Sequence, residues 1–556
     1  MIADSSSPPV PTRNALWPGL VLLGIALYRV CFWVPGDDHW WHMLTGRLVL
    51  ETGRVPSTDP FSFTFQGAPW INWEWLAGVV MYLAWAAGGA LGLTILRAVS
   101  LGGTILLVLR HWRRQGGAFL DRSRDLAALL VGAALLLVAM VRTNDRPHTY
   151  AYLLLAAAHA LATRIRDRWS MGAAAGLVAL FVVWVNFHPS WMLGMGLCGA
   201  VFLDALIRDW RRNRRLLPLG AAMAASVLLT PNLGRFFGSV SDIFSEKVSA
   251  EWDPVWRFLS PTHVPLITFL LVALAWIVSV ARTLPDRSFP AKEVCQQLVL
   301  AVLLVLAFRH AMLTPVFTIA ALPYLRLDRL GWGTATRGLK PRIEALVAGL
   351  ATVLILVLVQ KSFGRLTFGI GVDPHTNPVA QASFLEARGL GGKIYCTSKE
   401  AHGYMAFRLW PKATIYIDGR VPQVFPASFL ERYRQTGRRQ VLNEEIDRYG
   451  IDHVVLAVGL FAPVNVQTAD ALRARGDFAL VYFDENGALW SRRKNGGWPC
   501  PTCRPFEILD PYLLLRRSTS GALPDSPALR QELAHLQKIA PGSKLARDLA
   551  RAVRRP

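Results

Sequence analysis

Two adjacent carboxylates begin the segment of this chain that is richest in side chains able to do chemistry. Residues 36–60, GDDHWWHMLTGRLVLETGRVPSTDP, open with Asp37 and Asp38, and His39 and His42 follow at once. The segment comes directly after an apolar run long enough to cross a bilayer. Ionisable residues are costly beside a membrane helix, and they mark functional sites where they occur. The cluster therefore predicts a site in which a carboxylate acts as a base or as a ligand.

Structural roles compete with this interpretation. The tryptophans between the two histidines are typical of the aromatic belt at a membrane interface, and a histidine at a helix end is commonly a hydrogen-bonded cap. Asp37 and Asp38 could cap the helix that follows, but a cap needs only one acid. Asp59, directly before a proline, is explained as a turn residue. The paired acids, the two histidines and nearby Glu74 favour the functional interpretation.

The composition indicates a membrane protein. The chain is 53% hydrophobic and only 18% charged, with a mean hydropathy of +0.31, whereas soluble domains are about 45–50% apolar and about 25% charged. Apolar runs of spanning length predict a mainly α-helical, polytopic bundle of about 11–13 helices with a soluble α/β domain after it. The runs fall near 15–33, 73–88, 90–110, 125–141, 149–164, 171–187, 190–208, 215–231, 264–282, 294–308, 311–325 and 343–361.

The net charge of +22 lies mostly in short loops between these runs. Arginines gather at 110–115, 163–169, 208–215 and 326–342. This is the positive-inside pattern that orients membrane helices. We therefore interpret the charge as a topology signal and predict no nucleic-acid partner.

This pattern predicts a topology. Residues 1–14 form a short cytoplasmic leader, and the membrane domain spans 15–361 with outer loops at 34–72 and 232–263. Within the first outer loop, residues 42–53 predict a short amphipathic helix that ends at its glycine. The acidic pair then lies on the outer face.

The number of predicted membrane crossings is inconsistent with the predicted side of the C-terminal domain. Twelve full crossings would return the C-terminal domain to the cytoplasm, although we expect that domain outside. Either one segment between residues 73 and 110 does not span, or the charge rule fails at 110–124.

The composition becomes that of a soluble domain from about residue 362. We assign 362–500 to an extracytoplasmic α/β domain and 501–556 to a basic, partly helical tail. Asp418, Gly419 and Arg420 predict either a functional turn or a salt-bridged strand end. Predicted strands are KIYCTS, ATIYIDGR, HVVLAV and ALVYFD, and predicted helices are FPASFLERYRQ and RRQVLNEEIDRYG.

The cysteines are few, six in all. Cys500 and Cys503 form a lone CPTC, which suits a small disulfide or a redox pair, while a zinc site would need two more ligands. We favour a local disulfide outside the cytoplasm.

The predicted outer face carries a shared set of acids, histidines and arginines. Arginine binds phosphate through paired hydrogen bonds, and a carboxylate can remove a proton from an attacking hydroxyl. Acids with histidines can also hold a divalent cation. Such a set suits an anionic, lipid-linked substrate. Its members are Asp37, Asp38, His39, His42, Asp59, Glu74, Arg146, His148, Asn186, His188, Glu251, Asp253, Arg309 and His310.

An acidic pair just after the first membrane helix, followed by a long outer loop with an amphipathic helix, resembles the GT-C superfamily of membrane glycosyltransferases. The run DDHWWHMLTGRLVLETGRVPSTDPFSF and the later APWINWEWLAG are similar to a bacterial branch without an assigned substrate. RPHTYAYLLL, NFHPSWMLGMGL, EWDP, FRHAMLTPVF and YIDGR are similar to later elements of that branch, so the resemblance covers most of residues 15–460. The branch usually has NHEWL where this chain has NWEWL, so Trp73 departs from the pattern and Glu74 is kept.

The resemblance implies a sugar donor carried on a polyprenyl phosphate, and a lipid, glycan or protein acceptor at the outer face of the bacterial cytoplasmic membrane. It implies that an acid of the first outer loop acts as base or helps to bind a divalent cation, Mg²⁺ or Mn²⁺. The catalytic candidates are Asp37, Asp38 and Glu74, with Asp38 favoured because it lies nearer the histidines. Metal candidates are Asp38 and His42. Candidate substrate and phosphate ligands are His39, His42, Arg146, His148, His188, Glu251, Arg309 and His310.

Two other functions stay open at this point. A transporter or flippase for a lipid-linked sugar would use the arginines without the base, but such proteins often contain internal repeats, and we find no convincing one. A non-catalytic component of envelope-polysaccharide assembly is the third alternative. The retained Asp37, Asp38 and Glu74 argue against it.

Overall fold

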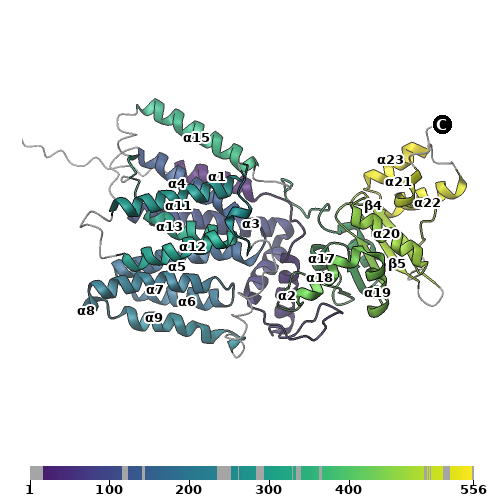
Figure 1. Cartoon of the computed structure of the whole chain (residues 1–556), viewed down its shortest axis with the longest axis horizontal. Coiled ribbons are helices and arrows are strands. Elements are labelled where there is room, and N and C mark those ends of the chain that lie inside the picture. The colour runs from purple at the N-terminus through teal and green to yellow at the C-terminus, as the bar shows by residue number, and fades with distance from the viewer. Residues whose placement is uncertain are drawn as a thin grey trace, which may run out of the picture.

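The structure is a computed structural model, in which a helical bundle and a C-terminal α/β domain lie at opposite ends (Figure 1). The predicted leader 1–14, most of the predicted loop 232–263 and Glu251 lie outside the described residues. The described residues are 17–115, 123–140, 144–233, 252–260, 262–283, 293–327, 330–332, 340–361, 366–493, 497–498, 500, 503–517 and 526–553.

The bundle confirms the predicted fold class. Among the described residues, four helices are long and apolar enough to cross a membrane: α3 (Trp75–Gln115), α7 (Trp191–Arg208), α11 (Val264–Thr283) and α15 (Pro341–Lys361). α5 (Pro147–Asp167) packs against α3 and α7. Shorter elements are α1 (Trp17–Val30), α4 (Ser123–Ala139), α6 (Met171–Val185), α8 (Trp210–Asn213), α9 (Leu216–Ala225), η2 (Ser226–Leu229), η5 (Val255–Arg257), α12 (Val294–Arg309), η6 (Ala311–Leu313), α13 (Thr314–Ala321) and η7 (Leu322–Tyr324).

The two predicted spans near residues 80 and 100 form one bent element, α3. Gly88 and Gly89 leave the helical conformation, and Gly89 has a φ of 56°. A Cβ added to Gly92 would lie 1.8 Å from the carbonyl oxygen of Ala84. Eight residues of straight helix would separate these positions by about 12 Å, so the chain folds back on itself here. The first arm, residues 75–88, is about 21 Å long and therefore shorter than a hydrocarbon core of about 30 Å. This favours the first topological alternative, in which one segment between 73 and 110 does not span.

Helix α2 (His39–Thr52) directly follows the acidic pair and packs against the first arm of α3. A Cβ on Gly46 would lie 2.1 Å from the carbonyl oxygen of Gly78. The two backbones therefore touch, because neither position has a side chain. As predicted, α2 ends at Gly53, which has a left-handed φ of 66°.

The C-terminal domain contains a five-stranded sheet in the order β2-β1-β3-β5-β4. The first three strands are parallel, and β5 is antiparallel to both β3 and β4. The four predicted strands and two predicted helices are present, while β5, α16, α17 and α20 were not predicted. The elements are β1 (Gly392–Cys396), β2 (Ala413–Ile415), β3 (His453–Leu456), β4 (Phe478–Asp484), β5 (Gly487–Arg492), α16 (Val379–Ala387), α17 (Lys399–Leu409), α18 (Ala427–Arg434), η8 (Gln435–Gly437), α19 (Arg439–Tyr449) and α20 (Pro463–Arg475).

The basic tail packs on this sheet. It contains α21 (Pro511–Arg517), α22 (Pro527–Ile539) and α23 (Lys544–Val553), and the last two contact β4. Glu485 accepts a hydrogen bond from the Ser543 hydroxyl at 2.6 Å and from the backbone N–H of Lys544 at 3.1 Å. The carboxylate therefore caps the start of α23.

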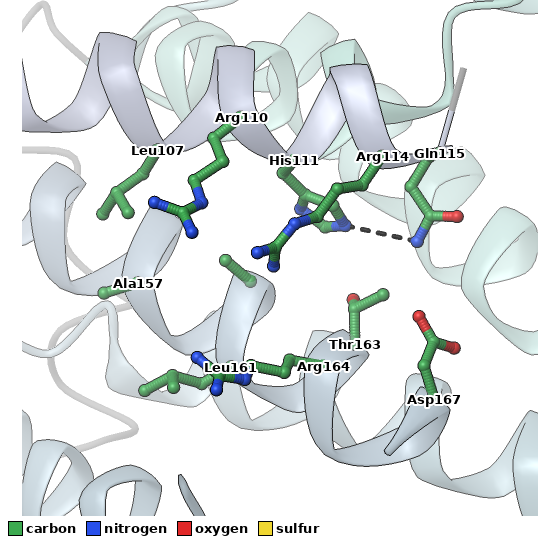
Figure 2. Close-up of a pocket in the computed structure, with 11 residues that line it drawn as sticks. Leu107, Arg110, His111, Arg114, Gln115, Ala157, Leu161, Thr163, Arg164 and Asp167 are labelled. Carbon is green, nitrogen blue, oxygen red and sulfur yellow. Dashed lines mark hydrogen bonds between the residues drawn. The ribbon is translucent and has the colours of Figure 1, made fainter. Parts of the chain in front are cut away.

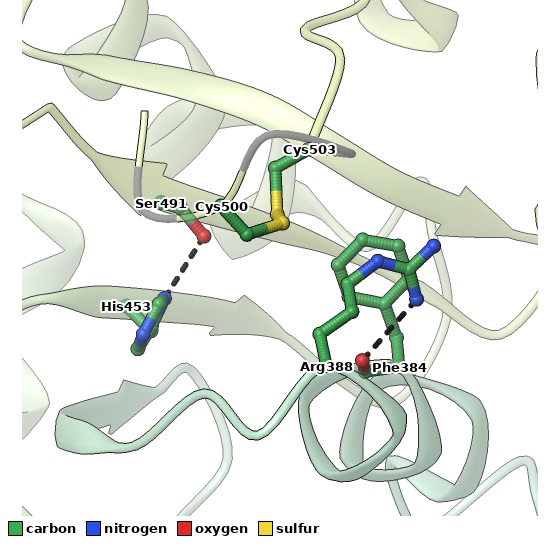
Figure 3. The surroundings of a disulfide bond; sticks show 6 residues. All are labelled: Phe384, Arg388, His453, Ser491, Cys500 and Cys503. Atoms are coloured by element: carbon green, nitrogen blue, oxygen red, sulfur yellow. Dashed lines mark hydrogen bonds between the residues drawn. A yellow bond between two sulfur atoms is a disulfide. The ribbon is translucent and has the colours of Figure 1, made fainter. Parts of the chain in front are cut away.

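Cys500 and Cys503 form the predicted local disulfide. Figure 3 shows it near the hydrogen bond between His453 of β3 and Ser491 of β5, whose side-chain atoms are 2.9 Å apart. Disulfides persist in oxidising compartments. The bond therefore agrees with an extracytoplasmic position for this domain.

The loop predicted as the first outer loop, residues 34–72, is joined to the C-terminal sheet. The backbone N–H of Phe63 donates to the carbonyl of Ile415 at 3.0 Å, and the N–H of Ile415 donates to Phe61 at 3.1 Å. Trp40 Nε1 donates to Asn377 Oδ1 at 2.8 Å. The loop therefore extends the sheet at its β2 edge.

Arg420 fixes this junction. Its fully buried guanidinium lies 2.7 Å from Asp59 Oδ1 and 2.8 Å from Asp418 Oδ2, and it stacks 4.7 Å from the ring of Trp70. Burial opposes the charge of Arg420, but the two carboxylates raise its pKa, so it stays protonated. Asp59 also forms the predicted turn, since it accepts the N–H of Phe61 at 3.0 Å.

We predict that Arg420→Met destabilises the protein by about 3–5 kcal/mol, because Asp59 and Asp418 would stay buried without a partner. The measurement is thermal unfolding of the purified protein in detergent. Arg448→Met is the matched control, because Arg448 is an exposed arginine of the same domain and its loss should cost less than about 0.5 kcal/mol. Equal melting temperatures for the two variants would contradict the prediction.

Candidate active site

A cavity of about 730 Å³ lies where α2, the starts of α3 and α5, and the C-terminal domain meet. Both halves of the molecule contribute polar side chains to it. The membrane part supplies Asp38, Trp41, His42, Glu74, Arg146, Pro147, His148, His188, Trp252 and Met312, and the C-terminal domain supplies Thr397, Ser398, Lys399, Glu400, Gly419, Val421, Gln423, Leu430, Tyr433 and Arg434.

Arg146, which immediately precedes α5, binds both predicted aspartates. Its Nη2 lies 2.6 Å from Asp37 Oδ1 and 2.8 Å from Asp38 Oδ2. The other oxygen of Asp37 accepts a hydrogen bond from Asn144 Nδ2 at 2.8 Å. Both oxygens of Asp37 are thus engaged behind the cavity, whereas Asp38 lines it.

Asp38 lies between two cations and a glycine. Lys399 Nζ is 4.0 Å from Asp38 Oδ1, and a Cβ added to Gly419 would lie 1.7 Å from the same oxygen. Burial alone would raise the pKa of Asp38, but Arg146 and Lys399 outweigh it and hold that pKa well below its usual range. Asp38 is therefore ionised, and position 419 has room only for a glycine.

Glu74 lies between two histidines on the other side of the cavity. Its Oε2 is 3.5 Å from His42 Nε2, and its Oε1 is 3.4 Å from His188 Nε2. His188 Nδ1 is 2.8 Å from Ser190 Oγ, and the ring of His148 lies 6.1 Å from that of His188. Burial, aided by the charge of Arg146, lowers the pKa of His42 to about 3. His42 is therefore neutral at physiological pH.

The C-terminal domain adds the start of a helix to the cavity wall, a contribution that the local sequence pattern did not predict. Thr397, Ser398 and Lys399 line the cavity at the first turn of α17. The N-terminal end of a helix presents unpaired N–H groups and a partial positive charge. Burial opposes the charge of Lys399, but Asp38 and Glu400 raise its pKa, so the ammonium group is retained.

Three predicted ligands lie away from the cavity. His39 is fully buried, and neither of its ring nitrogens has a hydrogen-bond partner among the described residues. Arg309, at the end of α12, is exposed. His310 Nδ1 lies 3.0 Å from the carbonyl oxygen of Trp252. It therefore supports a residue that lines the cavity but does not line it itself.

Two further members of the predicted set have local roles. Asn186 accepts a hydrogen bond from Trp75 Nε1 at 3.0 Å. Asp253 lies 2.9 Å from Arg257, four residues later. Both stabilise the loops around the cavity rather than its wall.

The metal candidates Asp38 and His42 do not form a metal site with their neighbours. In the part of the chain that the structure describes, no three His, Cys, Asp or Glu side chains are close enough together to hold an ion. Arg146 and Lys399 already supply positive charge to the oxygens of Asp38. Arginine and lysine side chains in this position suit the binding of a phosphate group better than the binding of a divalent metal ion.

The fold is similar to solved structures of membrane glycosyltransferases. One is ArnT from Cupriavidus metallidurans bound to undecaprenyl phosphate, with a TM-score of 0.53 and 13% identity over 87% of this chain and 98% of that one. Another is the archaeal oligosaccharyltransferase AglB from Archaeoglobus fulgidus in complex with an inhibitory peptide and a dolichol-phosphate, with a TM-score of 0.56 and 14% identity over 95% and 84%. Arabinofuranosyltransferase AftD from Mycobacteria matches 88% of this chain with 42% of its own, at 13% identity and a TM-score of 0.50.

The predicted GT-C fold is thereby confirmed, because these enzymes are GT-C glycosyltransferases. No family model and no curated protein matches the sequence.

We predict that acidification from pH 7 to pH 5 costs the wild type about 2 kcal/mol more stability than it costs His42→Gln. His42 has a pKa of about 3 in the fold and about 6.5 when unfolded, so only the unfolded chain takes up this proton in that range. Stability therefore falls with acid in the wild type, and the substitution removes this contribution.

The measurement is thermal unfolding across this pH range, with His375→Gln as the control because His375 is exposed. Parallel pH profiles for the wild type and His42→Gln would contradict the prediction.

Proposed function

We propose that this protein transfers a sugar from a polyprenyl-phosphate donor to a nucleophilic acceptor. The carrying observation is that Asp38 faces the cavity between two cations, Arg146 and Lys399, in a chain with the GT-C fold. The ArnT and AglB structures contain undecaprenyl phosphate and dolichol-phosphate. Their lipid phosphates have the chemistry that this pair of cations would bind.

In the proposed reaction, the acceptor oxygen forms a bond to the anomeric carbon as the bond from that carbon to the phosphate oxygen breaks. The acceptor proton passes to the Asp38 carboxylate, and polyprenyl phosphate leaves with the electron pair. Arg146 and Lys399 stabilise the charge that develops on phosphate. Attack opposite the leaving group inverts the anomeric configuration.

The low pKa of Asp38 gives donor binding a second role. A carboxylate held by two cations is a weak base. A donor phosphate that engages Lys399 and Arg146 draws positive charge away from Asp38 and raises its basicity. The base would therefore become competent only when the donor is present.

Glu74 is the second acid proposed for the cavity. It lies between His42 and His188, so the two histidine side chains fix the orientation of its carboxylate. In this proposal Glu74 orients the acceptor, which is a lipid, a glycan or a protein. Asp37 acts through Arg146, as a positioning residue for Asp38.

We place the reaction at the outer face of the bacterial cytoplasmic membrane. The disulfide Cys500–Cys503 supports this side for the C-terminal domain, since thiols stay reduced in the cytoplasm. The short arm of α3 supports a topology that leaves the acidic pair on the same side as that domain.

We predict that Asp38→Asn lowers sugar transfer by a factor of at least about 100, because it removes the proton acceptor. The assay reconstitutes purified protein in vesicles with a polyprenyl-phosphate sugar labelled in the sugar, and follows label in envelope lipid, glycan and protein fractions. Asp548→Asn, at an exposed site in α23, is the control.

Full transfer by Asp38→Asn would contradict the catalytic assignment. Labelled donor that crosses the bilayer intact, with no transfer by the wild type, would instead indicate the flippase.

We predict that Lys399→Met weakens binding of undecaprenyl phosphate about tenfold, because one charge-assisted contact is lost. Native mass spectrometry of the purified protein measures the bound lipid. Lys393→Met is the matched control, since the ammonium group of Lys393 contacts the carbonyl of Tyr449 instead. Equal affinities for the two variants would remove Lys399 from the site.

A further inference from the structure

A second cavity, of about 370 Å³, lies between the last turns of α3 and α5. Arg110 and Arg114 come from α3, and Arg164 comes from α5. Figure 2 shows their guanidinium groups directed into the space between the two helices. The proposed reaction uses none of these residues to bind its donor or its acceptor.

The three arginines concentrate positive charge without a matching acid. None of Arg110, Arg114 and Arg164 forms an ion pair with a described residue. Asp167, the carboxylate among the described lining residues, is instead 2.8 Å from Arg166 Nε. Like charges four residues apart on a helix repel, as Arg110 and Arg114 do. An anion between the helices would remove this repulsion.

The cavity wall also has an apolar part, beside the polar side chains of His111, Gln115 and Thr163. Leu107 of α3 and Leu161 of α5 line it, and Ala157 and Ala160 leave space because their side chains are small. Figure 2 shows Leu107 and Leu161 beside the guanidinium groups. A ligand that fits this cavity is anionic at one end and apolar at the other.

An exposed apolar stripe leads along α3 to the cavity. Ile95, Val99 and Leu106 are 55%, 57% and 51% exposed. Their spacings of four and seven residues place them on the helix face that carries Arg110. An acyl chain lying along this stripe would reach the arginines with its head group.

The cavity lies one membrane thickness from the candidate active site. Arg146 precedes α5 and Arg164 lies in its last turn, and their separation of 18 positions corresponds to a rise of about 27 Å. This approaches the hydrocarbon thickness of about 30 Å. The arginines therefore lie at the level of phosphate groups in the opposite leaflet.

We propose that this cavity binds the phosphate head group of an anionic membrane lipid, with its acyl chains along α3 and α5. Arginine forks bind phosphate oxygens in pairs, and basic pockets between membrane helices are suited to such head groups. A soluble phosphate would use the arginines but not the apolar wall or the stripe.

The experiment compares lipid binding by two triple variants of the full chain. Native mass spectrometry counts phosphatidylglycerol and cardiolipin bound per protein, with phosphatidylcholine as the neutral probe. The cavity variant is Arg110→Gln with Arg114→Gln and Arg164→Gln. The control is Arg211→Gln with Arg212→Gln and Arg214→Gln, which removes the same charge from exposed positions in and beside α8.

The expected result is about a tenfold loss of anionic lipid binding in the cavity variant, with little change in the control and none for phosphatidylcholine. Equal loss in both triple variants would overturn the proposal, as would unchanged binding in the cavity variant. Displacement of the lipid by millimolar inorganic phosphate would overturn it in favour of a soluble anion. Arg114→Gln alone, with an intermediate loss, serves if the triple variant does not fold.

Discussion

The buried guanidinium of Arg420 is the contact on which the site depends. It is shared by Asp59 of the 34–72 loop and Asp418 of the C-terminal domain, and separating the two parts would break at least one of these buried ion pairs. The loop and the domain therefore act as one unit. This unit brings Asp38 and Lys399, which are more than 350 residues apart in sequence, within 4.0 Å of one another.

Arg146 repeats this arrangement inside the cavity, where its guanidinium serves Asp37 and Asp38 together. The aspartates share one strong cation, and Lys399 supplies the second. His42 adds no charge, because its pKa lies far below neutrality. In the proposed reaction, a proton neutralises Asp38 while the phosphate gains negative charge. The total charge of the cavity stays constant, so the reaction needs no further counter-charge in the site.

Local sequence patterns predicted the helices and strands better than the contacts between them. The end of α2 at Gly53 and the strands follow from turn chemistry and alternation, so they were predictable. Lys399 was not, because its role arises only when the C-terminal domain docks on the membrane part. Arg309 is the reverse case, since the family resemblance implied a phosphate ligand there, whereas the fold leaves it exposed and outside the lining of the cavity. Hydropathy alone also divided α3 into two spans, and only the backbone at Gly89 shows that its first arm turns back.

Helix α5 gives the two sites a common frame. It begins directly after Arg146 and carries Arg164 in its last turn, and at its middle His159 Nε2 is 2.8 Å from the Tyr324 hydroxyl. Close packing of this kind resists local deformation and transmits strain along a helix. An anion bound between α3 and α5 at one end would therefore also fix the separation of these helices at the other. There, the start of α5 sets the distance from Arg146 to the acidic pair that precedes α2, and with it the positive charge that acts on the proposed base.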